Sequence, residues 1–520
     1  MKTFVSRFGA SIYGVLNGFD RIRFRGTQRL LASVQGLSRF LAFQGVLLKD
    51  FKSYVTGVTE QIRQQVETDA VAAGRTIIYV NDSQASKEEL AAAEAKRAGV
   101  QCGVQAILSA VEPCRTFFVR KDPGSGHLVL QNRLGKCLHY YHYWQHETLG
   151  PCHVRLQTWF PFNVFVCVNG RDMLAGQLDR LGLRYRKRDN CFPWVADVAA
   201  AQRCLDEQVR WDWSERLTAL VTASHPRWSE WPGMDRPHYW SADQTEWATD
   251  VMFQSAGELS RLMPRLVHLS LTGLGCGSAM RFLGRPVPAS GRPHENFIGE
   301  VSTDYVKRPE GVRVGFRVNG NGVKFYDKQS SVLRVETTIT DARDMKSYRT
   351  KESDPEGPKG WRRLKKGVSD LPRRTQVSQN SNERCLESLS TVASDRTLGE
   401  MTAEVCRGKT WEGRGVRALN LLAEKDLRLL RAVGQGEFLL NGLRNRDIRA
   451  LMFDREAKTD EEAKQQSGAV TRMLRMLRAH GVIRKVPSTH RYQVTERGRE
   501  LIVGLTTAYD ANPLKFQGAA

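Results

Sequence analysis

The amino-acid sequence predicts an α+β protein with several domains. Apolar and polar residues alternate along several short stretches, which is typical of strands with one buried face, and other stretches repeat apolar residues with helical spacing. At 520 residues, the chain is long enough for about three or four domains. We expect a mixed α/β amino-terminal region, an antiparallel meander, and a small, mainly helical domain near the carboxy terminus.

The net charge of the chain indicates which kind of molecule it is expected to bind. There are 78 Lys and Arg against 56 Asp and Glu, a formal net charge of +22. An excess of this size favours a polyanionic partner, most often nucleic acid. Hydrophobic residues make up 41% and charged residues 26%, which is ordinary for a globular protein and excludes a wholly disordered chain.

Membrane and secretion signals are missing from the sequence. No apolar run approaches the roughly 18 residues that a membrane span requires. The basic stretch 21–25 comes too early in the chain for a signal peptide. Ten cysteines occur singly and form no CxxC pair, which favours reduced thiols. We therefore expect no membrane partner and a cytoplasmic location.

Residues 1–210 are expected to form a mixed α/β domain. Asp20, Ile22 and Phe24 alternate with three arginines, which predicts a short strand with Asp20 on its apolar face. An acid in that position costs free energy unless it is paired or bound to a metal. Residues 88–99 are rich in alanine and end in glycine, as a helix often does.

The stretch 137–160 is dense in aromatic, histidine and cysteine residues. Cys137 with His139, and Cys152 with His153, have close spacings of the kind found in zinc sites. The same rings would also suit a surface on which the bases of RNA or DNA stack. Ordinary packing of a half-buried strand is the third interpretation, and the sequence leaves all three open.

Residues 211–341 are expected to hold a helical segment followed by a three-stranded β-meander. The first part, to about residue 300, is rich in tryptophan and mostly helical in pattern. Within 311–340, valines and phenylalanines alternate with Arg, Lys, Tyr and Glu, and the turn 319–322 reads Asn-Gly-Asn-Gly. This pattern predicts one apolar and one charged face.

Residues 342–406 are expected to be a basic linker that contains a helix. Between residues 342 and 375 there are eleven Lys or Arg against five Asp or Glu, and apolar periodicity is lost. The stretch 353–358 reads Ser-Asp-Pro-Glu-Gly-Pro, which is typical of a loop. A helix is predicted from Ser378 to Val392.

Residues 407–505 are expected to form a small domain, followed by a tail at 506–520. Helices are predicted at 424–433, at 441–453 and, with Ser467 as N-cap, at 468–480; strands follow at 482–486 and 491–495, and a last helix starts at Arg499. Between Arg407 and Glu500 there are 21 Lys or Arg and 12 Asp or Glu, so this domain carries a net charge of +9.

Three helices followed by a β-hairpin resemble the winged-helix family of DNA-binding domains. The stretches LRMLRAHGVIRK at 474–485 and RYQVTERG at 491–498 have that family's succession of recognition helix and wing. The resemblance covers about 85 residues and implies that helix 468–480 enters the major groove while the wing touches the backbone. The DNA-binding residues expected on this basis are Arg472, Arg475, Arg478, Arg444, Arg446, Lys485 and Arg491.

The meander contains the sequence Tyr326-Asp-Lys328, followed by Arg334-Val-Glu336. This pair of motifs is faintly similar to the end of the catalytic core of rolling-circle replication initiators. That resemblance implies phosphodiester chemistry, although the family's His-x-His metal pair does not occur in this sequence. The alternative is a sheet face that holds a phosphate backbone, with Glu336 neutralising a neighbouring arginine.

Acids at strand ends suggest a metal site. Asp20, Asp82 and Glu336 could together hold Mg²⁺ if the fold brought them together, although pairing of Asp20 with an adjacent arginine is the simpler expectation. The expected catalytic residues are Glu336, Tyr326, Lys328 and Asp20. The residues expected to contact a nucleic-acid backbone are Arg313, Arg317, Lys324, Arg334 and Arg155.

The sequence thus predicts a nucleic-acid-binding protein that docks on duplex DNA through its carboxy-terminal domain, as a regulator or mobile-element protein does. The alternative is a metal-dependent enzyme that processes DNA or RNA, a nuclease or strand transferase, with Mg²⁺ as cofactor. RNA binding through the aromatic stretch 139–160 is a third possibility.

Overall fold

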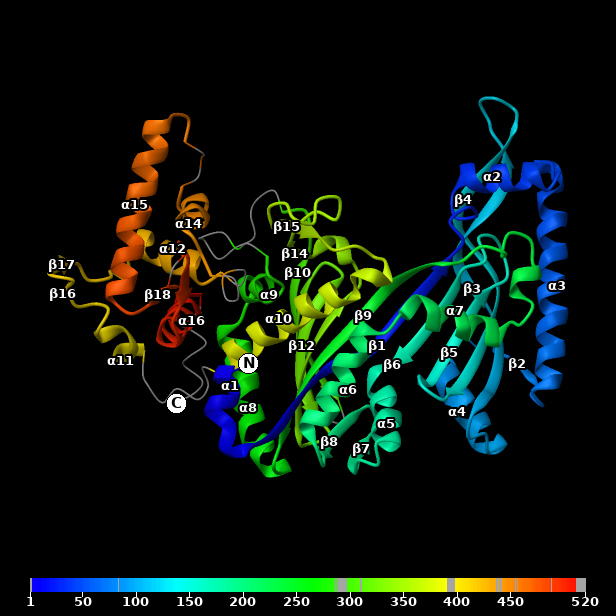
Figure 1. Ribbon diagram of the computed structural model, residues 1–520, viewed down its shortest axis with the longest axis horizontal. Coiled ribbons are helices and arrows are strands. Elements are labelled where there is room, and N and C mark those ends of the chain that lie inside the picture. The colour runs from blue at the N-terminus through cyan, green and yellow to red at the C-terminus, as the bar shows by residue number, and fades with distance from the viewer. Residues whose placement is uncertain are drawn as a thin grey trace.

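One continuous sheet crosses most of the molecule, in a computed structural model of the chain (Figure 1). The structure describes residues 2–510 apart from 83, 286, 288–296, 309–310, 391–397, 436–437, 439–441, 454, 456 and 488. Within those residues the sheet has eleven strands in the order β10-β11-β12-β13-β9-β1-β6-β5-β4-β3-β2. Its strands pair antiparallel except β2 and β3, which are parallel, so the sheet is mixed.

The strands differ greatly in length. They are β1 (Ile12–Thr27), β2 (Ile77–Tyr79), β3 (Gly103–Lys121), β4 (Leu128–His146), β5 (Gly150–Gln157), β6 (Val164–Asn169), β9 (Tyr239–Phe253), β10 (Val301–Arg308), β11 (Gly311–Val318), β12 (Asn321–Lys328) and β13 (Val332–Ile339). Two further strands, β7 (Tyr185–Arg188) and β8 (Cys191–Val195), form a separate hairpin. The predicted meander is confirmed as β11, β12 and β13.

Helices cover both faces of this sheet. They are α1 (Lys2–Phe8), α2 (Val34–Phe43), α3 (Phe51–Ala72), α4 (Lys87–Ala98), α5 (Gly170–Arg180), α6 (Val198–Arg210), α7 (Trp213–Ser224), α8 (Ala256–Gly273), α9 (Cys276–Phe282) and α10 (Leu371–Leu389). On one face, α8, α9 and α10 pack on the apolar side of the meander. On the other, α5, α6 and the β7–β8 hairpin cover one end of β1, β9 and β13.

A β-bulge in β1 changes the predicted orientation of Asp20. Phe19 pairs with Trp247 and Ile22 with Thr245, so β1 has one residue more than β9 between these pairs. Phe19 and Ile22 are both in the hydrophobic core, whereas Asp20 points to the opposite, charged face. The expectation that Asp20 shares a face with Ile22 and Phe24 is therefore wrong, because strict alternation fails at a bulge.

The long central strand β9 lies in the segment that was expected to be mostly helical. Trp247, Thr249 and Val251 project from one face of β9, and Glu246 and Asp250 project from the other; all five are buried. Both faces of β9 are buried, but one of them carries charged residues. The strand therefore shows neither a continuous apolar run nor the alternation of buried apolar and exposed polar residues that identifies a strand in a sequence. For that reason hydrophobic periodicity does not reveal this strand.

The expected boundary between residues 210 and 211 falls inside this continuous sheet. Strand β1, from the first expected domain, pairs directly with β9 of the second. The interval expected to be a linker also has more structure than its composition suggests. It contains a hairpin of β14 (Lys346–Arg349) and β15 (Gly360–Arg363), and α10 begins at Leu371 rather than at Ser378.

The carboxy-terminal part, at the left of Figure 1, is built mainly of helices. It has a hydrophobic core of its own, which includes Leu430, Ile448 and Leu474. Its elements are α11 (Leu398–Ala403), β16 (Lys409–Trp411), β17 (Arg414–Val416), α12 (Glu424–Val433), α14 (Asn445–Met452), α15 (Asp460–Ala479), β18 (Ile483–Lys485), β19 (Tyr492–Val494) and α16 (Glu496–Asp510). The predicted order of helices followed by a hairpin is present in these elements. Residues 511–520 of the expected tail lie outside the described residues.

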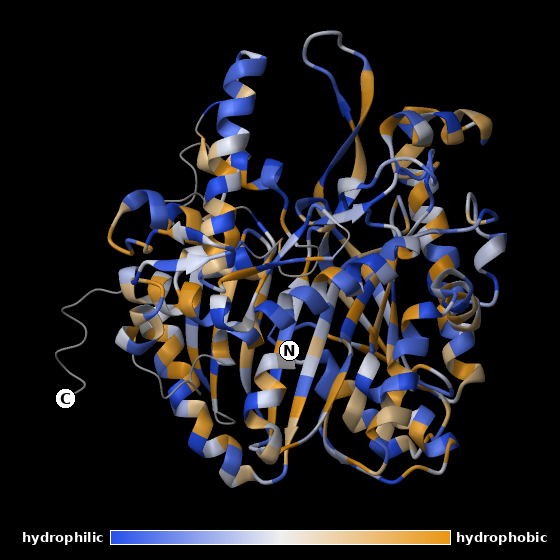
Figure 2. Ribbon diagram, turned by 60° about the vertical axis from the view of Figure 1, so that its left-hand side comes forward, coloured by the Kyte–Doolittle hydropathy of each residue, from blue (hydrophilic) through white to orange (hydrophobic). Residues whose placement is uncertain are grey.

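Helix α15 begins eight residues earlier than the sequence analysis placed it. Thr459 is its N-cap, and the Thr459 side chain accepts a hydrogen bond from the Glu462 backbone N–H. Three acids occupy the first turn, where they complement the helix dipole. Ser467 therefore lies inside the helix. Figure 2 shows that the projecting end of α15 is hydrophilic.

No helix among the described residues is long and apolar enough to cross a membrane.

Candidate active site and nucleic-acid interface

The charged face of the sheet gathers side chains from four neighbouring strands. In the register of the sheet, Lys324 lies opposite Glu336, and Tyr326 lies opposite Arg334. Arg334 in turn lies opposite Asp250 on β9. Residues that face each other across a ladder project to the same side, so these groups share one face, which Asp20 joins from β1.

Three carboxylates converge at the centre of this face. Asp20, Glu246 and Glu336 each place one oxygen so that all three lie within 4.8 Å of one another. We call these residues the carboxylate triad. Each is at most 5% exposed, so the three acids meet in a region largely shielded from water.

Asp20 and Glu336 each have defined partners. Asp20 Oδ1 accepts hydrogen bonds from Arg334 Nη1 at 3.0 Å and from Asn190 Nδ2 at 2.6 Å. Glu336 Oε1 forms an ion pair with Lys324 Nζ at 2.8 Å, and the Tyr326 hydroxyl donates to Glu336 Oε2 at 2.9 Å.

The third acid, Glu246, is paired with a cation that reaches the surface. Its Oε2 lies 3.4 Å from Arg21 Nε, and its Oε1 accepts a hydrogen bond from Gln244 Nε2 at 2.6 Å. The Arg21 side chain is 45% exposed and that of Lys324 27%. Solvent therefore approaches the triad from the side of these two cations.

Arg334 holds the buried side of the cluster together. Its guanidinium donates to Asp250 through Nε at 2.6 Å and through Nη2 at 2.9 Å. Arg171 Nη2 lies 3.0 Å from the same carboxylate. Because Arg334 is fully buried, it cannot reach a phosphate backbone, and the expectation of a backbone contact by this residue is wrong.

Burial and neighbouring charges set the protonation of the acids in different ways. Burial raises the pKa of Asp20 to about 6, helped by the charges of Glu336 and Glu246 and opposed by Arg334. Burial acts in the same direction on Glu336, but Lys324 and Arg334 outweigh it, and the pKa of Glu336 is lowered. One acid of the triad, Asp20, therefore loses its proton at a higher pH than an ordinary aspartate does.

Tyr326 remains a phenol at neutral pH. Burial and the neighbouring charge of Glu336 raise the pKa of Tyr326 well above its ordinary value. Its hydroxyl is held in place by the hydrogen bond that it donates to the Glu336 carboxylate. A divalent cation bound between the three carboxylates would find oxygen ligands, the kind that Mg²⁺ and Mn²⁺ prefer. It would also offset the repulsion among the three acids that contributes to the raised pKa of Asp20.

The structure brings together only part of the predicted site. Asp20, Glu336 and Tyr326 lie together, and Lys328 lies on the same face but is paired with Asp189. Asp82 does not join them, because it is in the loop after the edge strand β2, with β6, β5, β4 and β3 between β2 and β1. Its exposed carboxylate instead accepts a hydrogen bond from the Gln84 backbone N–H.

Glu246 is the residue that sequence reasoning missed. It lies on β9, where Gln244, Glu246, Ala248 and Asp250 follow each other at every second position. Polar residues at a spacing of two, among tryptophan, threonine and valine, are the signal that could have identified a strand with an acidic face.

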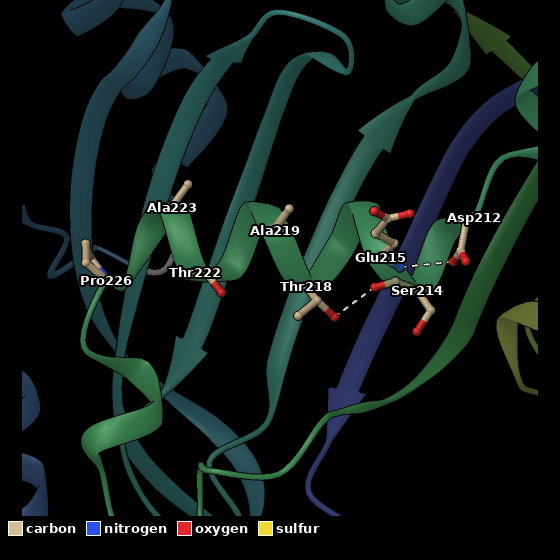
Figure 3. Close-up of a pocket in the computed structure, with 8 residues that line it drawn as sticks. All are labelled: Asp212, Ser214, Glu215, Thr218, Ala219, Thr222, Ala223 and Pro226. Carbon is tan, nitrogen blue, oxygen red and sulfur yellow. Dashed lines mark hydrogen bonds between the residues drawn. The ribbon is translucent and has the colours of Figure 1, made fainter.

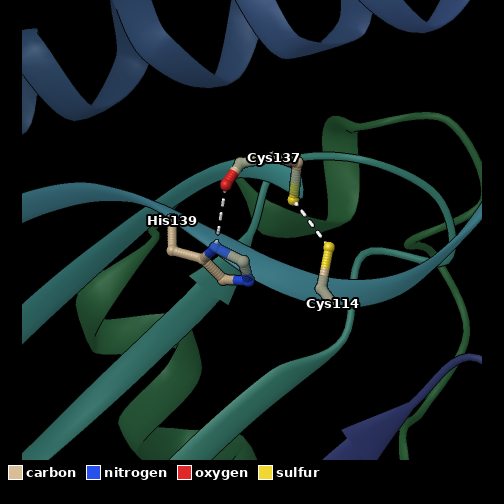
Figure 4. A group of neighbouring side chains, drawn as sticks. All are labelled: Cys114, Cys137 and His139. Atoms are coloured by element: carbon tan, nitrogen blue, oxygen red, sulfur yellow. Dashed lines mark hydrogen bonds between the residues drawn. The ribbon is translucent and has the colours of Figure 1, made fainter. Parts of the chain in front are cut away.

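A second cluster combines Cys114, Cys137 and His139 on β3 and β4 (Figure 4). The two sulfurs are 3.3 Å apart, and all three side chains are buried. His139 Nδ1 contacts the Cys137 carbonyl oxygen at 3.1 Å, and its Nε2 lies 3.1 Å from Arg155 Nη2. Both imidazole nitrogens thus have protein partners, so these residues are satisfied without a metal.

Of the two Cys/His pairs considered for zinc, only Cys137 and His139 lie in this cluster. Cys152 and His153, the second expected pair, do not belong to this cluster. Burial lowers the pKa of His139 to about 4, so the imidazole is neutral at physiological pH. Arg155, expected to contact a nucleic-acid backbone, lies between this imidazole and Glu112, to which it is paired at 3.2 Å.

The aromatic stretch 139–160 does not form a base-stacking surface. Tyr140, Tyr141 and Tyr143 are at most 8% exposed, and His142 is 1% exposed. Strand β4 contacts α2 as well as its neighbouring strands, and the rings of His142 and His225 meet edge to face at 4.6 Å. These four rings are core residues, so they are not available to stack on the bases of RNA or DNA.

A wide cleft of about 940 Å³ lies along α7, but its polar groups are used within the helix (Figure 3). Asp212 accepts a hydrogen bond from the Glu215 backbone N–H as N-cap, and the Thr218 hydroxyl donates to the Ser214 carbonyl. The lining also includes Ala219, Ala223 and Pro226, and the Glu215 carboxylate is exposed. Apart from the N-cap Asp212 and Glu215, no acid, histidine or cysteine among the described residues lines the cleft, so we do not assign a function to it.

The carboxy-terminal part contains a basic cleft of about 410 Å³. We call it the α15 cleft; it is lined by Trp411, Glu412, Arg414, Thr471, Arg475, Arg478 and Tyr492. The guanidinium of Arg478 lies 4.8 Å from the centre of the Trp411 ring and that of Arg475 lies 5.9 Å from it. Arg478 is 4.0 Å from Glu412, whereas Arg472 and Arg475 have no carboxylate partner among the described residues.

The remaining expected DNA contacts are spread around this cleft. Arg446 is exposed and lies 3.6 Å from Asp447, and Lys485 is exposed on β18. Arg444 and Arg491 are half-buried. In the meander, Arg313 and Arg317 both pair with Asp304, at 3.3 and 3.4 Å, so each of these cations is partly neutralised.

Comparison of the chain with protein-family models, with curated proteins and with solved structures finds no match.

Proposed function

We propose that the protein binds duplex DNA through the basic face of α15. The observation that carries this proposal is the row Arg472, Arg475 and Arg478. Arg475 and Arg478 lie over the Trp411 ring, and among the described residues only Arg478 approaches an acid, Glu412 at 4.0 Å. Guanidinium groups spaced in this way pair with phosphates or with guanine edges. The order of α12, α14, α15 and the β18–β19 hairpin supports the winged-helix interpretation of this part.

Such a protein would act in the cytoplasm, where all ten cysteines, which are free in this structure, stay reduced. A DNA-binding unit joined to a large sheet suits a mobile-element or regulatory protein. Its affinity should fall steeply with salt, because each neutralised phosphate releases counterions.

Replacing Arg472, Arg475 and Arg478 together by alanine tests the docking. We expect the affinity for duplex DNA to fall. The slope of log affinity against log salt concentration should become less steep by the amount that corresponds to about three lost phosphate contacts. The matched control removes three exposed lysines elsewhere, Lys49, Lys52 and Lys96. Fluorescence anisotropy with a labelled duplex at several salt concentrations measures both variants. Equal losses in the two triple variants would contradict docking by α15.

A second function is favoured by the convergence of Asp20, Glu246 and Glu336 beside the Tyr326 hydroxyl. We propose that this site carries out metal-dependent phosphodiester chemistry on the bound nucleic acid. The triad would hold Mg²⁺ or Mn²⁺, and Lys324 would stabilise the negative charge of a phosphate. Tyr326 is the side chain placed to act as nucleophile or as acid.

Nicking of supercoiled plasmid in the presence of Mg²⁺ or Mn²⁺ tests this chemistry. We expect Glu336→Gln to abolish nicking, because a neutral amide is a weaker ligand for the divalent cation than a carboxylate and removes one negative charge from the triad. Asp82→Asn is the control, since Asp82 is an exposed acid far from the triad. Nicking that persists in Glu336→Gln, with the folded state verified by circular dichroism, would rule out this site as the catalytic centre.

A further inference from the structure

The β14–β15 hairpin is a small sheet of its own, outside the eleven-stranded sheet (Figure 1). In its register, Lys346 lies opposite Arg363, and Tyr348 lies opposite Trp361. Opposed residues of an antiparallel pair, and residues two apart on one strand, project to the same side. Two cations and two aromatic rings therefore share one face, which we call the hairpin face.

The hairpin face is open to solvent. Trp361 is 45% exposed, and Lys346 and Arg363 are both exposed. The ring of Tyr348 lies 5.5 Å from that of Trp361, at an angle of 58°. Among the described residues, no carboxylate forms an ion pair with Lys346 or Arg363, so both cations are available to an external anion.

The other side of the hairpin is anchored. Ser347, Met345 and Leu364 are buried, and the Leu364 backbone N–H donates to the Met345 carbonyl at 2.9 Å. Arg362 Nε donates to the Arg349 carbonyl at 3.2 Å, which crosslinks the two strands. The hairpin face is thus a firmly held platform rather than a loose loop.

The hairpin is also fixed to the central strand of the molecule. The Ala242 backbone N–H donates to the Lys366 carbonyl at 2.9 Å, just after β15, and Ser241 forms a bridge with Gly367. Strand β9 continues from this point to Glu246 of the triad. A chain bound to the hairpin face would therefore lie at the end of the strand that carries one of the triad acids.

Neither packing nor solubility explains this combination of side chains. A packing role would bury Trp361, and a purely solubilising hairpin would not expose a large aromatic ring on the same face as two cations without an ion-pair partner among the described residues. The surrounding segment, residues 345–366, contains eight Lys or Arg and three Asp or Glu, so the field around the rings is positive. An exposed tryptophan ring with a second aromatic ring and two cations beside it is an arrangement that binds unpaired nucleotides.

We propose that the hairpin face binds single-stranded nucleic acid. A base stacks on Trp361 beside Tyr348, and Lys346 and Arg363 contact the adjoining phosphates. Duplex DNA cannot use the rings in this way, because its bases are already stacked and paired. This site is separate from the α15 cleft, so it does not depend on duplex docking.

Fluorescence anisotropy with labelled oligothymidylate and oligouridylate of about 20 nucleotides tests the proposal, a length above the site sizes of known single-strand modules. We expect Trp361→Ala to weaken binding at least fivefold, since stacking contributes about 1–3 kcal/mol per base. Trp361→Phe should retain most of the affinity. The two oligonucleotides show whether the site prefers the deoxyribose or the ribose backbone.

A second pair of variants tests how much the two cations of the hairpin face contribute to single-strand binding. Lys346→Ala with Arg363→Ala should weaken single-strand binding well beyond Lys49→Ala with Lys52→Ala, which removes the same charge from exposed positions elsewhere. A duplex of the same length should lose less than twofold on Trp361→Ala. Unchanged single-strand affinity in folded Trp361→Ala, or an equal loss for the duplex, would overturn the proposal. The triple arginine variant of α15 should leave single-strand binding by this face intact, so failure here and failure of duplex docking are distinguishable.

Discussion

The charged face of the sheet and the α15 cleft are both rich in arginine, but they use it in opposite ways. In the sheet, Arg334 is fully buried and donates to two carboxylates. In the α15 cleft, Arg475 and Arg478 lie over a tryptophan ring and remain in reach of solvent. The difference teaches that the partner of each cation, rather than local charge density, decides whether an arginine holds the fold or binds an external anion.

The largest expected effect is the difference in folding stability between losing a buried arginine and losing an exposed one. Arg334→Ala leaves Asp20 and Asp250 buried without their main cation, and we expect a loss of about 3–5 kcal/mol in the free energy of unfolding. Arg472→Ala removes an exposed side chain and should change stability by about 0.5 kcal/mol or less. Denaturant unfolding of the two variants checks this contrast. Similar losses in both would break the comparison.

The second prediction concerns pH and a metal. The pKa of Asp20 is raised to about 6 in the folded protein from 3.8, so the folded state binds this proton more tightly than the unfolded state. The stability that Asp20 contributes is therefore fully present below about pH 3.8 and is lost as the pH rises through 6. A divalent cation must displace the same proton.

We therefore expect the affinity for Mn²⁺ to rise about tenfold per pH unit below pH 6 and to level off above it. Titration calorimetry in two buffers of different ionisation enthalpy measures both the affinity and the proton released. Asp82→Asn should behave as the unmodified protein, because its exposed side chain lies outside the triad. Affinity that does not vary between pH 5 and 7 would show that Mn²⁺ does not bind at Asp20.

The smallest effect sharpens the comparison at the α15 cleft. Among the described residues, Glu412 is the acid that forms an ion pair with the arginine row; it lies 4.0 Å from Arg478 and its side chain is 61% exposed. Exposed pairs of this kind contribute about 0.2–1 kcal/mol, so Glu412→Gln should raise duplex affinity by no more than about fivefold. Anisotropy at low salt detects such a change. A decrease in affinity would mean that Glu412 positions Arg478 for DNA rather than competing with it.

Local patterns were sufficient where one face of an element is apolar. The meander of β11, β12 and β13 follows from its alternation, and α12 follows from its helical spacing with the bounds Glu424–Val433. Helix α4 ends at Gly99, which adopts the left-handed conformation expected of a glycine at that position. In each case the residues that decide the structure are close together in the sequence.

The same patterns failed where both faces of a strand are buried. Strand β9 has acids on one buried side, and β1 contains a bulge that reverses the orientation of Asp20 relative to Ile22. Neither the partner strand nor the bulge is visible in local alternation. Glu246 was missed for this reason, and Asp82 was included because position at a strand end says nothing about which edge of the sheet that strand occupies.

The sequence by itself determined the net charge, the meander, the helices and hairpin near the carboxy terminus, and the presence of Asp20, Tyr326 and Glu336 as chemically capable residues. The tertiary structure alone decided that Asp20 and Glu336 meet Glu246, that Arg334 is buried, and that a basic segment folds into a hairpin. The physical reason is that charge and periodicity are local properties of the chain. Burial and the choice of ion partner instead depend on which strands pair. Strands β1 and β13 pair with β9 from opposite sides, although Asp20 and Arg334 are 314 residues apart in the sequence.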